Sequence, residues 1–160
     1  MKKIFENEYQ ISRKFLKEYV YGVLCKKVLI IGITISLIGA LFSFFTTSQN
    51  KYIIITSSII ALVTSIITPI ITIKELENLS RRLNNGKIEK TNIKFSNNII
   101  MKEGKAHLEF EYNQITKIVY TKNFIVLKTS NNSAILVLKS GFLKGTKQEF
   151  IKFIEEKIIN

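Results

Sequence analysis

Two long apolar runs dominate the middle of the chain. They cover Val28–Thr46 and Tyr52–Ile73, and the short polar tip 47–51 separates them. Neither run contains a charged residue, and each is about as long as the roughly 20 residues that a helix needs to cross the hydrocarbon core of a bilayer. The pattern therefore predicts a two-helix transmembrane hairpin with spans at 28–46 and 52–73.

The alternative for these runs is a buried hairpin inside a soluble domain. A core helix of a soluble protein keeps a charged or strongly polar face. The polar groups here are mainly Ser, Thr and Gly, which transmembrane helices tolerate. A cleaved signal peptide is also disfavoured, because its apolar part is shorter and lies nearer the N-terminus, and no second span follows it directly.

Small residues recur at every fourth position of both runs, which indicates that the two helices pair. In an antiparallel hairpin folded about residues 48–49, Gly32 falls opposite Ser65, Ser36 opposite Ala61, and Ala40 opposite Ser57. Small side chains at this spacing let helix backbones approach closely, although small residues are also common in membrane helices generally. Pro69 is predicted to bend the second helix near its cytoplasmic end, because it removes one backbone hydrogen bond.

Basic residues flank the hairpin, whereas the tip holds a single one, Lys51. They include Lys26 and Lys27 before the first run, and Lys74, Arg81 and Arg82 after the second. Positive flanks stay in the cytoplasm. We therefore expect a multi-pass protein of the cell membrane with both termini cytoplasmic. We call these five residues the basic collar and expect it to attract anionic lipid headgroups, at about 1 kcal/mol per cation near the surface.

The net charge of the chain strengthens this expectation. Lys and Arg number 24 against 12 Asp and Glu, which gives +12 over 160 residues and a pI near 9.8. Nucleic acid is the competing partner for so basic a protein. The basic residues are dispersed, however, and no helix-turn-helix, zinc-finger or RNA-binding signature accompanies them. We therefore expect the lipid bilayer and its headgroups as partners, and no nucleic acid.

The polar segments on either side of the hairpin give the domain organisation. Residues 1–27 read as a short edge strand over Lys3–Gln10, then an amphipathic helix that Ser12 caps and that runs straight into the first span. Residues 74–86 read as a charged juxtamembrane helix that ends at Asn84-Asn85-Gly86.

From residue 87 to residue 160 the pattern changes to short strands broken by turn residues such as Asn131-Asn132. The expected strands are Thr91–Ser96, Ile99–Lys102, Lys105–Tyr112, Thr116–Thr121, Phe124–Thr129 and Ser133–Leu138. A capping box, Thr146 to Glu149, then opens an amphipathic helix that covers the sheet. The fold class is α+β: a membrane hairpin followed by a small antiparallel domain closed by a C-terminal helix.

Four stretches in the last part of the chain carry a resemblance to a known family. They are residues 95–100, 112–118, 134–139 and 150–158, and this chain has Leu138 where members tend to have a proline before the lysine at Lys139. They resemble the YcxB-like family of small bacterial membrane proteins. The resemblance implies that the C-terminal part is a pleckstrin-homology-like (PH-like) domain. It implies no reaction and no catalytic residue.

Residue chemistry argues against catalysis. His107 is the only histidine, so one chain cannot form a histidine metal cluster or a Ser-His-Asp array, and its strand alternation turns it towards solvent. Cys25 is the only cysteine, which excludes an internal disulfide, and a packing role at the head of the first span is favoured over acylation. No phosphate-binding glycine pattern is present. We expect a non-enzymatic protein without a cofactor or metal.

Two functional hypotheses follow. The first is a membrane-anchored scaffold or regulator whose PH-like domain engages anionic lipid headgroups or a membrane protein at the cytoplasmic face. The second is self-immunity against a membrane-active, bacteriocin-type antimicrobial peptide, which rests on an analogy of architecture alone. A small subunit of a larger membrane complex also remains open.

Overall fold

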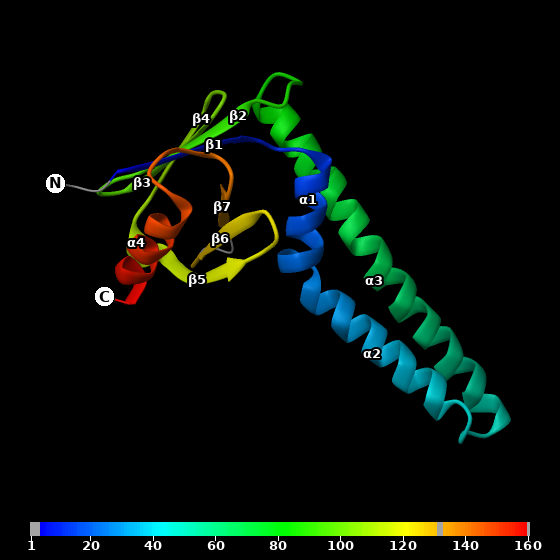
Figure 1. Ribbon diagram of the computed structural model, residues 1–160. Helices are drawn as coiled ribbons and strands as arrows, with labels where there is room; N and C mark the ends of the chain where they lie inside the picture. Colours follow the sequence, from blue (N-terminus) through cyan, green and yellow to red (C-terminus); the bar gives the residue numbers. More distant parts are fainter. Residues whose placement is uncertain (1–3, 131–132, 160) are drawn as a thin grey trace. The chain divides into compact units, whose positions relative to one another are not determined.

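The computed structural model describes residues 4–130 and 133–159, so Lys3 and the predicted turn Asn131-Asn132 lie outside the described residues. The chain forms two compact units (Figure 1). The sheet unit combines Met1–Phe15 with Glu77–Asn160, and the helical unit is Leu16–Leu76. The α+β class, with antiparallel sheets and a C-terminal helix, is confirmed.

The larger sheet has five antiparallel strands in the order β4-β3-β2-β1-β8. Their bounds are β1 Phe5–Gln10, β2 Lys90–Phe95, β3 Ile99–Glu103, β4 Ala106–Phe110 and β8 Phe142–Lys144. The expectation of an edge strand near the N-terminus is wrong, because β1 lies between β2 and β8. Strand β8 has three residues, too few for a visible alternation, so its pairing with β1 left no signal in the sequence. The N-terminal strand therefore belongs to the same unit as the C-terminal strands.

The smaller sheet contains three antiparallel strands in the order β5-β6-β7. They are β5 Ile115–Tyr120, β6 Phe124–Thr129 and β7 Ala134–Leu138, and the short 3-10 turn η2, Tyr112–Gln114, precedes β5. All residues of β6 except Lys128 are buried. A continuous apolar run of this kind is typical of a strand that is covered on both faces. The six strands predicted after residue 87 are confirmed, within a few residues at their ends.

Helix α4, Lys147–Ile159, completes the core of the sheet unit. Its capping box forms as predicted, since the Thr146 N–H donates to Glu149 Oε2 at 3.0 Å and the Glu149 N–H donates to Thr146 Oγ1 at 3.3 Å. Phe150 is fully buried, and its ring lies 4.6 to 5.6 Å from those of three strand residues, Phe5, Phe95 and Phe142. Aromatic rings from both ends of the chain thus share one core.

A buried asparagine connects the two sheets. Asn7 on β1 is fully buried, and its Nδ2 donates to the Leu138 carbonyl oxygen of β7 at 2.8 Å. The Leu138 N–H donates to Asn7 Oδ1 at 3.0 Å. The side-chain amide therefore replaces a neighbouring strand for one residue of β7, and both backbone groups of Leu138 are satisfied by it.

The helical segments begin with α1, Arg13–Tyr19, which the Ser12 side chain caps through the Phe15 N–H at 3.3 Å. A π-helical turn, η1, covers Val20–Leu24, and α2 covers Lys26–Phe42. The expectation that the first helix runs straight into the span is wrong, because the axis bends by 63° between Leu24 and Lys26. The cause is local: the Cys25 N–H closes a wide turn onto the Val20 carbonyl at 2.7 Å, and the Cys25 backbone leaves helical geometry.

Helix α3, Ser48–Leu83, is continuous for 36 residues and includes Pro69. It ends where predicted: Asn85 and Gly86 have positive φ angles, and the Gly86 N–H donates to the Arg81 carbonyl at 2.7 Å. By length and composition, Asn50–Arg82 is one helix able to cross a membrane, and a second such segment exists if the bent pair Arg13–Leu24 and Lys26–Phe42 is counted as one span.

Candidate functional site

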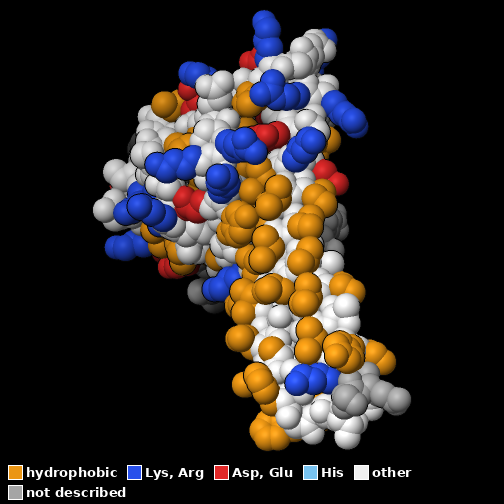
Figure 2. Space-filling view, turned by 90° about the vertical axis from the view of Figure 1, so that its right-hand side faces the viewer, with side chains coloured by type: hydrophobic (Ala, Val, Ile, Leu, Met, Phe, Trp, Pro, Cys, Tyr) orange, Lys and Arg blue, Asp and Glu red, His pale blue; other side chains and the backbone are white. Residues whose placement is uncertain are grey.

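The most unusual surface of the molecule is the outer face of α2 and α3. Large apolar side chains stand exposed along both helices, from Val28 at 44% to Ile71 at 50%. Figure 2 shows hydrophobic side chains along the two helices, with most Lys and Arg side chains outside this stretch. Only 17% of the most apolar stretch of α3 is buried. Soluble monomers rarely expose a continuous apolar surface of this extent.

Small residues line the contact between α2 and α3. A Cβ atom added at Gly32 would collide with the Ser65 Cβ and lie 3.2 Å from the Ala61 carbonyl oxygen. One added at Gly39 would collide with the Ser58 side chain. Ser58 and Ser65 are 6% and 2% exposed. The two helices therefore approach closely at both glycines, and at Gly32 a larger residue would displace the Ser65 Cβ atom.

This seam agrees with the predicted register in one pair and departs from it in another. Gly32 lies against Ser65 as predicted, and Ser36 and Ala61 are half-buried between the glycine contacts. Ala40 and Ser57, however, are exposed, and Gly39 and Ser58 occupy the contact instead. A four-residue repeat drifts by about 40° per step around a helix of 3.6 residues per turn, so it leaves a shared face within a few steps.

The observed contacts follow a seven-residue spacing that the sequence analysis missed. On α2 they occur at Cys25, Gly32 and Gly39, and on α3 at Thr72, Ser65 and Ser58. The Cys25 Sγ lies 3.9 Å from Thr72 Oγ1, so the cysteine packs in the seam. A heptad drifts by only about 20° and keeps one side of each helix against its partner.

The seam predicts opposite outcomes for two neighbouring substitutions. Gly32→Leu should destabilise the helix pair by about 1–3 kcal/mol, because the added side chain overpacks a close contact. Ala40→Leu should change stability by less than about 0.5 kcal/mol, since Ala40 is exposed. Thermal unfolding of the full chain in mild detergent measures both. Equal effects at the two positions would contradict the observed seam.

The residues of the basic collar are all exposed. Lys26 and Lys27 open α2, and Lys74 lies two residues beyond Thr72, which contacts Cys25. These three lysines therefore share one end of the helix pair, whereas Lys51 lies at the other end. Arg81 and Arg82 are on the last turns of α3, within the sheet unit.

The C-terminal end of α3 is attached to the five-stranded sheet by one carboxylate. Glu103 on β3 accepts hydrogen bonds from Ser80 Oγ at 2.7 Å, Asn84 Nδ2 at 3.0 Å and Thr91 Oγ1 at 3.2 Å. Gly104 follows with a φ of +55°, and a Cβ there would collide with Asn84 Oδ1. The sharp turn after Glu103 thus brings the β3–β4 hairpin against the helix end.

Comparison with known proteins bears on the strands and on α4. Residues 95–154 match the family described as YcxB-like protein. The match confirms the resemblance noted in the sequence, and it extends from the last residue of β2 to the middle of α4. No curated protein and no solved structure matches the chain. Strand β1 and helices α2 and α3 lie outside the YcxB-like segment.

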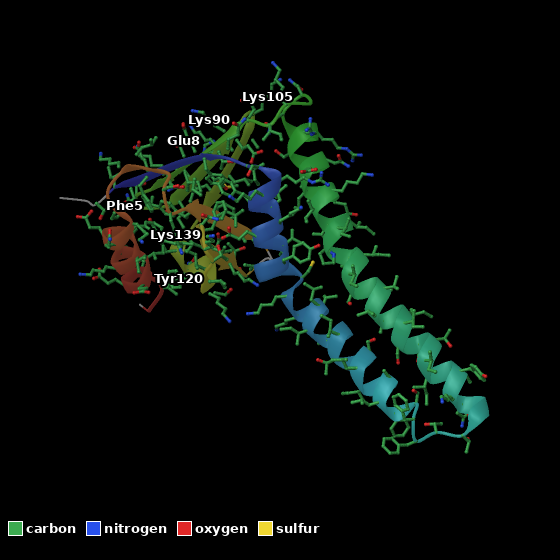
Figure 3. The ribbon with its side chains drawn as sticks, turned by 45° about the vertical axis from the view of Figure 1, so that its right-hand side comes forward. Phe5, Glu8, Lys90, Lys105, Tyr120 and Lys139 are labelled. Carbon is green, nitrogen blue, oxygen red and sulfur yellow. The ribbon has the colours of Figure 1, made fainter. Side chains whose placement is uncertain are left out.

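Within the YcxB-like segment, Lys139 has a structural role. Its Nζ donates to the Thr121 carbonyl and, at 3.2 Å, to the Lys122 carbonyl, while its backbone N–H donates to the Asn123 carbonyl at 2.9 Å. It therefore closes the β5–β6 turn (Figure 3). The preceding Leu138, where the resemblance implies a proline, uses its N–H to bind Asn7, and a proline has no N–H to donate.

Two tyrosines of the YcxB-like segment have a strongly raised pKa. Burial raises the pKa of Tyr112 to about 12, and its hydroxyl donates to the Ser96 carbonyl at 3.0 Å. The pKa of Tyr120 is also raised to about 12, first by burial and then by its 2.7 Å hydrogen bond to Glu155 on α4. Both shifts favour the neutral phenol, which is the state that packs the sheet against α4.

The Tyr112 shift predicts a loss of stability at alkaline pH. The phenol ionises near pH 10 in the unfolded chain and near 12 in the folded one, so its contribution is complete below pH 10 and disappears as the pH rises through 12. Tyr112→Phe should be about 1 kcal/mol less stable than the wild type at pH 8, because the hydrogen bond is lost. The stability advantage of the wild type, measured by urea unfolding with far-UV circular dichroism in mild detergent, should shrink above pH 10 and reverse before pH 12, because the loss from a shift of this size exceeds the hydrogen-bond contribution. A constant difference would contradict the shift.

The described residues contain no cluster of three His, Cys, Asp or Glu side chains suited to a metal ion. His107 is exposed on β4 and lies opposite Lys102 of β3. The outward face of the five-stranded sheet instead carries ion pairs, such as Lys90 Nζ with Glu8 Oε1 at 2.8 Å (Figure 3). These residues read as a solvated sheet face.

Proposed function

We propose that the chain is a non-enzymatic, membrane-anchored scaffold or regulatory protein. In this proposal α2 and α3 cross the bilayer as a hairpin, both termini are cytoplasmic, and the sheet unit is a PH-like domain. That domain engages anionic lipid headgroups or a protein partner at the cytoplasmic face. The arrangement of a five-stranded sheet, a three-stranded sheet and a C-terminal helix supports the PH-like part of the proposal.

The observation that carries the proposal is the exposure of large apolar side chains on both helices. Ile30, Leu37 and Ile38 on α2 are 54% to 61% exposed, and Ile53, Ile60 and Ile70 on α3 are 53% to 68% exposed. Each side chain of this kind gains about 1.5–3 kcal/mol when it is fully removed from water. The hydrocarbon of a bilayer removes all of them from water at once.

The polar residues of α3 also suit an apolar solvent. The hydroxyls that face outward return hydrogen bonds to carbonyls of their own helix, as in Thr64 Oγ1 to the Ile60 carbonyl at 2.9 Å and Thr68 Oγ1 to the Thr64 carbonyl at 2.7 Å. A helix that satisfies its own backbone and hydroxyl groups meets the main requirement of the hydrocarbon region. The small-residue seam supports pairing of the two spans.

The orientation can be tested with single cysteines, because Cys25 is the only native one. In a Cys25→Ser background, a cysteine replaces either Lys51 at the tip or Ser140 in an exposed loop of the sheet unit. A membrane-impermeant maleimide added to intact cells should label the Lys51→Cys chain and spare the Ser140→Cys chain. Cell lysis should make both reactive. Labelling of Ser140→Cys in intact cells would contradict the proposed orientation.

A further inference from the structure

Two lysines face each other across neighbouring strands of the smaller sheet. The pairing register places Lys117 of β5 directly opposite Lys128 of β6. Directly opposed residues of an antiparallel pair have their Cβ atoms about 4.5–5.5 Å apart, and like charges there are destabilising. On the larger sheet the same chain pairs lysine with glutamate, as in Lys94 opposite Glu6. The lysine pair is therefore a local exception with an energetic cost.

A β-bulge creates this arrangement. The register shifts between Ile115, which pairs with Thr129, and Lys117, which pairs with Lys128. Thr116 and Lys117 consequently both oppose Lys128, and Thr116 Oγ1 donates to the Lys128 carbonyl oxygen at 3.3 Å. Bulges re-aim side chains and are over-represented beside functional sites.

The two lysine side chains are available to a ligand. Thr116 and Lys117 are exposed and Lys128 is half-buried, and the residue opposite Lys128 on β7 is the small Ala134. Within the described part of the chain, the ion pairs involve Arg13, Lys90 and Lys94, and neither ammonium of the lysine pair has an acidic partner. Two ammonium groups without an acidic partner match the charge and the acceptor oxygens of a phosphate group.

We propose that Lys117 and Lys128 bind the phosphate of an anionic lipid headgroup. The choice of a lipid rests on the proposed function, in which the sheet unit works beside a membrane. A nucleic-acid site usually adds aromatic side chains for base stacking. The nearby aromatic residues are otherwise engaged: Tyr120 is bonded to Glu155 of α4, and the Tyr112 ring contacts Phe153 of α4.

The test uses the full chain in a neutral detergent, with short-chain phosphatidylglycerol, short-chain phosphatidylcholine and inorganic phosphate as probes. Phosphatidylglycerol should bind the wild type more tightly than either other probe. Lys117→Gln with Lys128→Gln should weaken that binding about 30-fold, from about fivefold per lysine. The matched control, Lys102→Gln with Lys152→Gln, removes the same charge from exposed positions on β3 and α4 and should change it less than twofold.

Several outcomes would overturn the site. They are the same loss in both double variants, no preference of the wild type for phosphatidylglycerol over phosphatidylcholine, equal affinity for inorganic phosphate, or tighter binding of a single-stranded oligonucleotide. Membrane retention of the same variants after alkaline extraction is measured in parallel. If retention is unchanged while headgroup binding is absent, the site is refuted and the membrane anchorage of the proposed function stands.

The free protein supplies a second readout. Lys117→Thr relieves the repulsion across the bulge and should raise the melting temperature by roughly 1–4 °C in the absence of lipid. Added phosphatidylglycerol should raise the melting temperature of the wild type more than that of the variant. If the variant and the wild type had the same melting temperature without lipid, and the lipid raised both equally, the lysine pair would be a solvated pair without a ligand.

Discussion

Lysine at both Ile60 and Val63 of α3 should prevent stable insertion of the chain into the membrane. In the structure these side chains are 60% and 44% exposed, near the middle of the second apolar run. At an exposed position in water such a change costs little. At the centre of a bilayer each lysine costs about 2.5–3.5 kcal/mol, so the pair should lower the membrane-inserted fraction more than a thousandfold. The fraction of full chain retained after alkaline extraction measures this.

Leu79→Lys is the matched control for this substitution. Leu79 is 53% exposed on the same helix, beyond the predicted span and among charged residues. Its replacement should leave membrane retention unchanged. Two outcomes would show that α3 is a water-exposed helix. One is equal membrane retention of the Ile60→Lys, Val63→Lys chain and the wild type, and the other is that both of these chains are monodisperse in plain buffer.

Asn7→Leu is expected to lower the free energy of unfolding of the sheet unit by about 1–3 kcal/mol. The substitution removes both hydrogen bonds between the Asn7 side chain and Leu138. It leaves the Leu138 N–H part-buried without its partner, at about 1–3 kcal/mol, whereas the Leu138 carbonyl oxygen keeps the hydrogen bond that the Gly141 N–H donates at 3.0 Å. Hydrogen exchange of β7 peptides, measured by mass spectrometry on the full chain in mild detergent, should show faster opening.

The control for Asn7 is Asn92→Leu on the outward face of the same sheet. Asn92 lies half-buried on β2 opposite Glu8. Its replacement should change the free energy of opening of β7, measured by hydrogen exchange, by less than about 0.5 kcal/mol. Similar exchange in Asn7→Leu and in the wild type would mean that the two sheets are held together without this asparagine.

The sequence predicted best where one local signal decided the structure. The Thr146–Glu149 capping box, the Ser12 cap and the stop at Asn84-Asn85-Gly86 all form, because each depends on a few residues next to one another in the chain. Strands β2 to β7 were predicted for the same reason, since alternation and turn residues are local, whereas the three-residue strand β8 was not predicted. The bend at Cys25 was not predicted, because the residue types of η1 do not indicate a π-helical turn.

The contact between α2 and α3 was predicted only in part. The position of the turn between the helices predicted the Gly32–Ser65 contact. In an antiparallel pair the residue numbers of facing positions have a constant sum, so the turn sets which residues face each other. The turn does not decide which small residues lie in the seam. That depends on how far around the helix axis the repeat rotates at each step. The four-residue repeat was more visible, yet the seven-residue spacing of Gly32 and Gly39 holds the contact.

By itself, the sequence determined the apolar character of α2 and α3, strands β1 to β7 and the resemblance over residues 95–154, since these depend on composition and short-range pattern. Only the tertiary structure decided that β1 is an inner strand, that Asn7 bonds to Leu138, that Glu103 holds the end of α3 and that Lys117 opposes Lys128. Each of these contacts joins residues that are brought together by strand pairing or by packing. Their energies depend on distance in space, which the order of residues along the chain does not specify.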